Sequence, residues 1–143
     1  MDNQDLQYVS ELRTVVARLI KKLRRQTISA TFLSLTERST MAALLQNGGM
    51  LPSELAAMEK ITNQSMSQIV SHLLGLGFIT RTGSPTDKRK VIIALTEQGK
   101  QLIIQSRNER DSWLAGAIKE TCTAEEQEIL KKAIKPLTKL VDF

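Results

Sequence analysis

The feature that most constrains the fold is a change of hydrophobic pattern near residue 76. Over residues 63–75 apolar side chains recur at the three- and four-residue steps of an amphipathic helix: Met66, Ile69, Val70, Leu73 and Leu74. Residues 78–81 and 91–95 are instead short apolar runs typical of strands. The connection between them is rich in turn residues and ends in three consecutive cations. This order predicts a helix followed by a two-stranded ribbon with a basic tip.

The second face of the helix at 63–75 carries no Glu, Lys or Arg. Its side chains are short hydroxyls and amides, with one imidazole: Asn63, Gln64, Ser65, Ser67, Gln68, Ser71 and His72. A helix face that only meets solvent normally carries Glu and Lys, which are good helix formers. Hydroxyl and amide groups both donate and accept hydrogen bonds, as recognition of base edges in a major groove requires.

Two shorter helices are expected before this one. The first begins with Thr36 as its cap and ends at the glycine pair that follows Asn47, and the second spans about residues 53–59. A tight turn then leads to Thr62, which caps the helix at 63–75. Two short helices joined by a tight turn fit a helix-turn-helix.

Longer helices are expected at both ends of the chain, over residues 6–25, from 97 to about 118, and from the Thr123 cap onward. The last one has an apolar stripe from Ile129 to Val141, which packs either within its own chain or against a second copy. Four cations end the first helix, where they oppose the helix dipole or contact phosphate: Lys21, Lys22, Arg24 and Arg25.

The 143 residues suit one compact unit, and their aromatic content of 3% favours a mainly α core of aliphatic side chains. Net charge is +3 over residues 1–35, +2 over 36–96 and zero over 97–143, so a polyanion-binding part is expected to precede an assembly part. One cysteine, Cys122, and one histidine exclude an internal disulfide and a Cys/His zinc site. We expect no metal, no cofactor, and an inert Cys122 thiol.

The acidic amino terminus does not resemble a secretory signal, and no apolar run has the length of a membrane span, so a soluble, cytoplasmic protein is expected. Phosphate-loop, dinucleotide-binding, nucleophile-elbow and metal motifs are missing from the sequence, which argues against an enzyme. A non-specific DNA coater would carry Lys and Arg on the polar helix. An adaptor without DNA binding would not need the cations at 88–90. Binding to duplex DNA is therefore favoured.

The sequence resembles the MarR-type winged helix regulators. The resemblance covers about residues 52–99. It lies in Pro52-Ser53-Glu54-Leu55-Ala56, in the run from Ser65 to Arg81, in Ser84-Pro85-Thr86-Asp87-Lys88-Arg89-Lys90, and in Leu95-Thr96-Glu97-Gln98-Gly99. It implies a winged helix-turn-helix lobe at residues 35–96, and dimerisation helices at 1–34 and 97–143. It also implies a homodimer on a pseudo-palindromic operator, with repression as the family habit.

The resemblance implies DNA contacts from the helix-turn-helix and the wing. Arg89 enters the minor groove and Asp87 holds it by an ion pair, while Arg38 and Ser39 add backbone contacts. The expected DNA-binding set is Arg38, Ser39, Ser53, Thr62, Asn63, Gln64, Ser65, Ser67, Gln68, Ser71, His72, Arg81, Asp87, Lys88, Arg89 and Lys90.

The resemblance further implies a dimer interface and a cleft for a small aromatic or phenolic effector that releases DNA. The cleft-lining candidates are Val16, Ile20, Met41 and Leu45, which are otherwise plain core. The expected interface comprises Leu6, Val9, Trp113, Leu114, Ile118, Ile129, Ile134, Leu137, Leu140 and Val141. Operator sequence, effector identity and the sign of regulation do not follow from the sequence.

Overall fold

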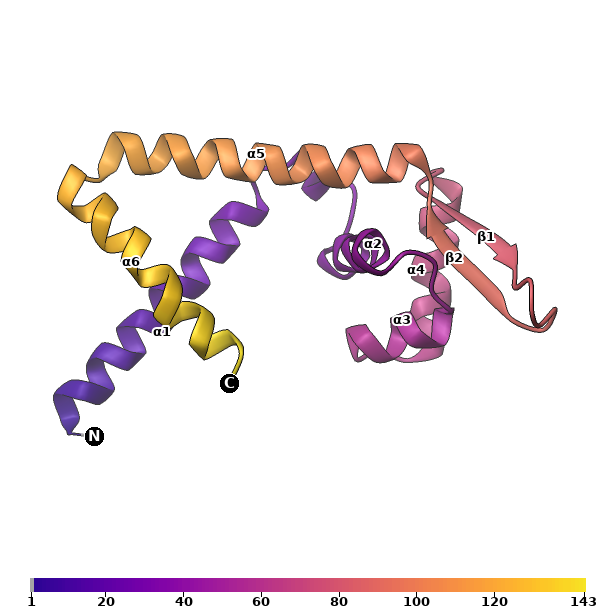
Figure 1. Ribbon diagram of the computed structural model, residues 1–143, viewed down its shortest axis with the longest axis horizontal. Helices are drawn as coiled ribbons and strands as arrows, with labels where there is room; N and C mark the ends of the chain where they lie inside the picture. Colours follow the sequence, from indigo (N-terminus) through magenta and orange to yellow (C-terminus); the bar gives the residue numbers. More distant parts are fainter. Residues whose placement is uncertain (1) are drawn as a thin grey trace.

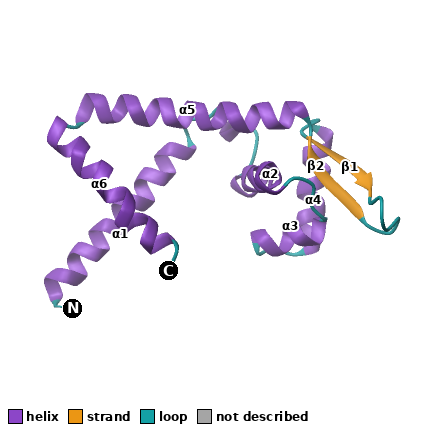
Figure 2. Cartoon of the chain, viewed as in Figure 1, coloured by secondary structure: helices purple, strands orange, loops and turns teal. Residues whose placement is uncertain are grey.

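The computed structural model describes residues 2–143, and within them it is mainly helical with one two-stranded sheet (Figures 1 and 2). In chain order the elements are α1 (Asn3–Arg24), the short 3-10 helix η1 (Ile28–Thr31), α2 (Leu35–Asn47), α3 (Pro52–Glu59), α4 (Asn63–Gly75), β1 (Ile79–Gly83), β2 (Val91–Leu95), α5 (Glu97–Thr121) and α6 (Ala124–Val141). The predicted fold class, mainly α with a β wing, is confirmed.

A compact lobe forms from α2, α3, α4 and the sheet, which pack around one aliphatic core. Met41, Leu55 and Met66 are fully buried there, one from each of the three helices, and Leu73 and Ile93 are buried with them. Burial of each such side chain stabilises the fold by about 1.5–3 kcal/mol. This core fixes the orientation of α4, and with it the direction of the polar face of that helix.

The strands β1 and β2 are antiparallel, with Ile79 opposite Leu95 and Gly83 opposite Val91. The start of α5 is joined closely to this ribbon. The Thr96 hydroxyl caps α5 by accepting from the Gly99 N–H at 3.0 Å, and donates to the Gly77 carbonyl at 2.7 Å. A Cβ on Gly99 would lie 2.2 Å from the Phe78 carbonyl oxygen, so only glycine allows this approach of helix and strand.

The long helix α5 leads away from the lobe, and α6 folds back from its far end, on the same side of the molecule as α1 (Figure 1). Neither α1 nor α6 has a buried residue. Their apolar stripes are exposed, so of the two alternatives for the stripe of α6, packing within its own chain is not what the described residues show. None of the helices in residues 2–143 is both long and apolar enough to cross a membrane.

The predicted helix caps are confirmed at Thr62 and Thr123, whose hydroxyls accept from the N–H groups of Ser65 and Glu126. The predicted cap at Thr36 is wrong, because Ser34 caps α2 and accepts from the Glu37 N–H at 3.1 Å. The Glu37 carboxylate accepts in return from the Ser34 N–H at 2.9 Å, which completes a capping box. Two bonds at Ser34 outweigh the single bond that Thr36 would provide.

Candidate nucleic-acid interface

The polar face of α4 lies on the surface of the lobe. Met66, Val70 and Leu73 are buried and define the inner side of the helix. At 100° per residue, Gln64 and Gln68 lie on the opposite side, and the other polar residues flank them. All seven are exposed: Asn63, Gln64, Ser65, Ser67, Gln68, Ser71 and His72. The structure thus brings these predicted site residues together on one uncharged, hydrogen-bonding surface.

The turn between α3 and α4 determines where α4, and with it this polar surface, begins. Lys60 ends α3 in the left-handed conformation (φ 56°), which reverses the chain within a few residues. The Thr62 side chain then caps α4, accepting from the Ser65 N–H at 3.0 Å and donating to the Ser65 hydroxyl at 3.0 Å. The first turn of α4 is therefore held in place by a side chain that also belongs to the predicted contact set.

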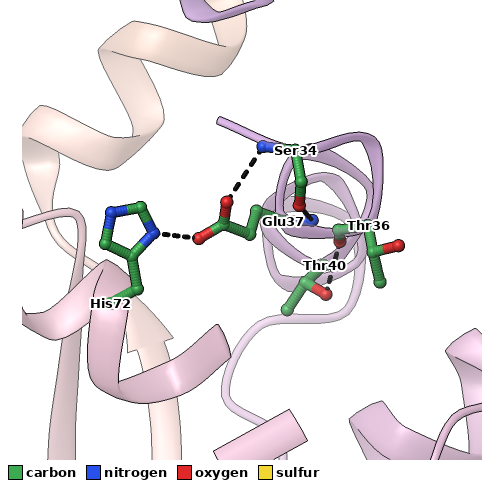
Figure 3. Close-up of polar contacts among 5 residues, drawn as sticks. All are labelled: Ser34, Thr36, Glu37, Thr40 and His72. Carbon is green, nitrogen blue, oxygen red and sulfur yellow. Dashed lines mark hydrogen bonds and ion pairs between the residues drawn. The ribbon is translucent and has the colours of Figure 1, made fainter. Parts of the chain in front are cut away.

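His72, the one imidazole of this face, is bonded through its Nδ1 to the Glu37 carboxylate at the start of α2 (Figure 3). Glu37 is buried, whereas the His72 side chain is half exposed. Burial raises the pKa of the Glu37 carboxyl, but the Ser34 backbone hydrogen bond and the bond and charge of His72 lower it by more, so the net shift is downward. One carboxylate thus caps α2 and ties α4 to it.

The wing carries the second group of predicted residues. The segment between β1 and β2 is closed by a hydrogen bond from the Ser84 N–H to the Lys90 carbonyl at 2.9 Å. Asp87 accepts from the Arg89 N–H at 3.0 Å, and its carboxylate lies 4.0 Å from the Arg89 Nε. The Arg89 side chain is 95% exposed. Asp87 therefore shapes the loop through the backbone and holds the guanidinium only loosely, and Lys88 and Lys90 are exposed beside it.

Two predicted residues lie apart from this surface. Arg38 and Ser39 line a cavity on the side of α2 that faces α1 and α5. Arg38 donates from Nη1 to the Arg24 carbonyl at 3.1 Å, and Ser39 donates to Glu59 at 2.7 Å. The structure thus does not join them to the α4 face. Ser53, in the first turn of α3, and Arg81, on β1, are both exposed.

The predicted effector cleft is not assembled from its four candidates. Met41 is completely buried in the lobe core, and Leu45 packs against that core. Val16 and Ile20 lie on α1 and are 37% and 41% exposed. In the single chain the four residues are therefore split between α1 and the core of the lobe.

The predicted interface residues are all at least partly exposed. Trp113, Leu114 and Ile118 are half-buried on α5, and Lys22 lies 5.7 Å above the Trp113 ring. The remaining ones are exposed on α1 and α6: Leu6, Val9, Ile129, Ile134, Leu137, Leu140 and Val141. Exposed fractions are 65% at Ile134 and Leu140 and reach 82% at Val141, an unusual amount of open apolar surface for a single chain.

Sequence reasoning missed two features. The first is Glu37, for which the spacing Ser34-x-x-Glu37 was a usable capping-box signal, although no sequence signal links it to His72. The second is the convergence of Arg38 with three further arginines from α1 and α5, at widely separated positions. Only the packing of helices brings those together.

Comparison with known proteins identifies the family to which the chain belongs. The MarR family model matches residues 33–91. An uncharacterized HTH-type transcriptional regulator of Mycobacterium bovis is 32% identical over 142 residues, covering 99% of this chain and 98% of the relative. The crystal structure of a proposed transcriptional regulator from Pseudomonas aeruginosa has a TM-score of 0.87 and 29% identity, with 100% and 99% of the two chains covered.

A likeness of fold alone extends further. A MepR mutant from S. aureus, solved bound to an oligodeoxyribonucleotide, has a TM-score of 0.73 at 18% identity, with 94% and 97% of the two chains covered. The relatives and the fold are those of transcription regulators rather than of enzymes. With a full-length relative above 30% identity and the family model matched across the lobe, the chain belongs to the MarR family of transcriptional regulators.

Proposed function

We propose that the protein is a homodimer that binds double-stranded DNA sequence-specifically, represses transcription, and releases its operator when a small effector binds. The observation that carries the proposal is the exposed, uncharged polar face of α4 beside a basic, exposed wing. Amide and hydroxyl groups can pair with base edges in the major groove, and an exposed arginine at a wing tip suits the narrow minor groove. The DNA-bound MepR structure, with the same fold, is consistent with this use of the fold.

The proposed DNA contacts differ from residue to residue. Gln64 and Gln68, on the outermost line of α4, make base contacts, while Ser53 and the α4 hydroxyls make mainly phosphate contacts. Arg89 enters the minor groove, and Arg81, Lys88 and Lys90 neutralise phosphates. The α4 face of one chain reads one half-site, so two copies are needed for a pseudo-palindromic operator.

Dimerisation is supported by the exposed apolar faces of α1 and α6. A second copy of this chain is the partner that fits these exposed faces, because an isologous dimer interface is formed by the same surface patch of both subunits. Leu137→Asp is expected to convert the dimer to monomer in analytical ultracentrifugation. Lys135→Asp, on the same helix, introduces the same carboxylate outside the apolar stripe, with a charge change of two units instead of one, and should leave the dimer intact. Dimers of both variants at micromolar concentration would contradict this interface.

DNA binding is tested by fluorescence anisotropy with a duplex from the region upstream of the protein's own gene and a scrambled duplex, over a salt series. We expect at least about a thousandfold preference for the first duplex, and affinity that falls as salt rises. Equal, weak binding to both would favour a DNA coater. No binding to either duplex at low salt would overturn the proposal and favour a protein-interaction adaptor.

A further inference from the structure

The groove between α2 and α4 connects a buried carboxylate to the polar face of α4. Glu37 lines the groove from the first turn of α2, and Gln68 and His72 line it from α4. Glu37 is buried, whereas the side chain of His72 is 50% exposed and belongs to the polar face. Of the residues that line the groove in the described chain, Glu37 and His72 are the two that ionise. The pair thus joins the inside of the lobe to the surface proposed to bind DNA.

The carboxylate determines which ring nitrogen of His72 carries a proton. The pKa of the Glu37 carboxyl lies below its ordinary value of 4.5, so this group is ionised near neutral pH and only accepts hydrogen bonds. The Nδ1 of His72, which is bonded to it, is therefore the donor (Figure 3). In the neutral imidazole the other nitrogen, Nε2, then has a lone pair and accepts, whereas in the imidazolium it has a proton and donates.

The Nε2 of His72 is the atom of the pair that is open to a ligand. Figure 3 shows it on the side of the ring turned away from Glu37, and it makes no hydrogen bond within residues 2–143. Four residues after Gln68, His72 lies about 40° round α4 from it and one turn further along, on the flank that faces α2. Because the N-terminal residues of a recognition helix make its base contacts, this flank in the second half of α4 suits a phosphate contact.

We propose that Glu37 is a positioning residue for DNA binding, which holds the ring of His72 so that its Nε2 faces a backbone phosphate and which stabilises the imidazolium that donates to that phosphate. This inference rests on the proposed function. The charged ring attracts a phosphate, whereas the neutral ring, with Nδ1 held by Glu37, turns a lone pair toward it and repels it. Duplex affinity should therefore rise as pH falls from about 8 to about 5, the range in which histidine ordinarily gains its second ring proton.

The other elements packed against α4 do not place an ionisable group in this groove, within the part of the chain that the structure describes. From α2 the groove receives Glu37 alone. Both α3 and β1 also pack against α4. The charged side chains of α3, of the turn after it and of β1 all lie outside the groove lining: Glu54, Glu59, Lys60 and Arg81. His72 is also the only histidine of the chain, so a pH dependence that is lost in a His72 variant belongs to this imidazole.

The first test measures duplex affinity by fluorescence anisotropy at pH 6.0 and pH 7.5 and constant ionic strength, with the upstream duplex and its scrambled form. The wild type should bind both duplexes at least about fivefold more tightly at pH 6.0, since a hydrogen bond from a charged donor is gained. His72→Gln keeps a neutral hydrogen-bonding side chain, so its affinities at the two pH values should differ by less than about twofold. Because the contact is to phosphate, His72→Gln should weaken the binding of both duplexes at pH 6.0 by a similar factor.

Glu37→Gln separates positioning from a structural role. It removes the charge that faces His72, so binding at pH 6.0 should weaken at least about threefold and most of the pH dependence should be lost. In a protein that already carries His72→Gln, adding Glu37→Gln should change neither affinity by more than about twofold, because Glu37 acts through the imidazole. Glu54→Gln is the matched control, since Glu54 is a capping carboxylate of the same lobe that is bonded to the Leu51 N–H. It should keep the wild-type ratio of affinities at the two pH values.

Nitrogen-15 magnetic resonance of the wild type tests the positioning role without any variant. His72 is the only histidine, so its ring signals are unambiguous. At a pH high enough to leave the ring neutral, its proton should be on Nδ1, as the bond to Glu37 requires. Adding the upstream duplex should move the titration of the ring to higher pH by at least about half a unit, because a phosphate at Nε2 favours the charged form. Thermal unfolding at both pH values verifies that each variant is folded.

The outcomes distinguish this inference from the proposed function. Specific duplex binding with equal wild-type affinities at the two pH values would overturn the inference and leave the proposed function intact. So would a neutral ring with its proton on Nε2, or a Glu37→Gln effect that is just as large in the His72→Gln background. Loss of duplex preference in His72→Gln, with unchanged affinity for the scrambled duplex, would also overturn it, because His72 would then contact a base. Absence of duplex binding at both pH values would overturn the proposed function and the inference together.

Discussion

Replacing Glu37 tests how the lobe holds its polar helix, since this buried carboxylate accepts from both the Ser34 N–H and His72 (Figure 3). Glu37→Ala removes both bonds. Loss of a capping interaction costs about 1 kcal/mol, and loss of the bond to a half-exposed imidazole about another 1–1.5 kcal/mol, for a total of about 2–2.5 kcal/mol. Glu37→Gln keeps an oxygen for Ser34 and loses only the charged partner of His72, so about 1 kcal/mol is expected.

The contribution of Glu37 to stability depends on pH, and the pKa shift of its carboxyl gives the direction of that dependence. The pKa of the Glu37 carboxyl in the folded protein lies below its ordinary value of 4.5. A carboxyl whose pKa is lower in the folded than in the unfolded protein stabilises the folded state at a pH above its unfolded-state pKa. That contribution is lost as the pH falls through the folded-state pKa. The stability difference between wild type and Glu37→Gln should therefore be full at pH 7 and shrink as pH falls below about 4.5.

The assay is thermal unfolding by circular dichroism at fixed protein concentration, for the two variants and for Thr36→Ala as control. Each 1 kcal/mol corresponds to a shift in Tm of about 2–4 °C at this chain length. The Thr36 side chain donates no hydrogen bond in the described structure, so its loss should cost under about 0.5 kcal/mol. A double-mutant cycle with His72→Ala should give a coupling of about 1 kcal/mol. A coupling near zero, or a Glu37→Gln penalty that is the same at pH 7 and pH 3.5, would refute the reasoning.

Three further changes test other parts of the account. Gly99→Ala should lower stability by about 1–3 kcal/mol in thermal unfolding, because its Cβ meets the Phe78 carbonyl at 2.2 Å. Gly116→Ala, with open space around it in the same helix, is the control and should be neutral or stabilising by up to about 1 kcal/mol. Equal effects of the two substitutions would contradict the close approach of helix and strand at Gly99. Thr62→Ala should cost about 1 kcal/mol of stability in chemical denaturation, and no loss would mean that the cap of α4 contributes nothing. Arg89→Ala should weaken duplex binding by about 1–3 kcal/mol in anisotropy titrations without altering Tm; unchanged affinity would exclude a wing-tip contact.

Much of the fold follows from short-range signals in the sequence. Thr62, Thr96 and Thr123 each cap a helix with a side chain that accepts from an N–H three residues on, so these helix starts could be predicted from local sequence. The cap of α2 could not be assigned as safely, because Ser34 and Thr36 are both good capping residues. The hydrogen bond that the Ser34 N–H donates to the Glu37 carboxylate is the added interaction that favours Ser34 as the cap.

The polar face of α4 could also be predicted, because a helix with one apolar side leaves the other side exposed wherever the lobe packs. The cavity lined by arginines could not. Arg24, Arg38, Arg107 and Arg110 converge only through the packing of three helices. The single chain also does not bring the four predicted cleft residues together, because periodicity shows which side of α1 is apolar but not what covers it. Val16 and Ile20 are exposed in the single chain.

The most direct test of the central claim compares wild type with the double variant Gln64→Ala/Gln68→Ala on two duplexes, the protein's own upstream region and its scrambled form, at one fixed salt concentration. The account predicts that the ratio of the two affinities falls at least about tenfold while the affinity for scrambled duplex stays within about twofold, because base contacts are lost and phosphate contacts remain. An unchanged ratio, with thermal stability intact, would contradict recognition of DNA by the polar face of α4.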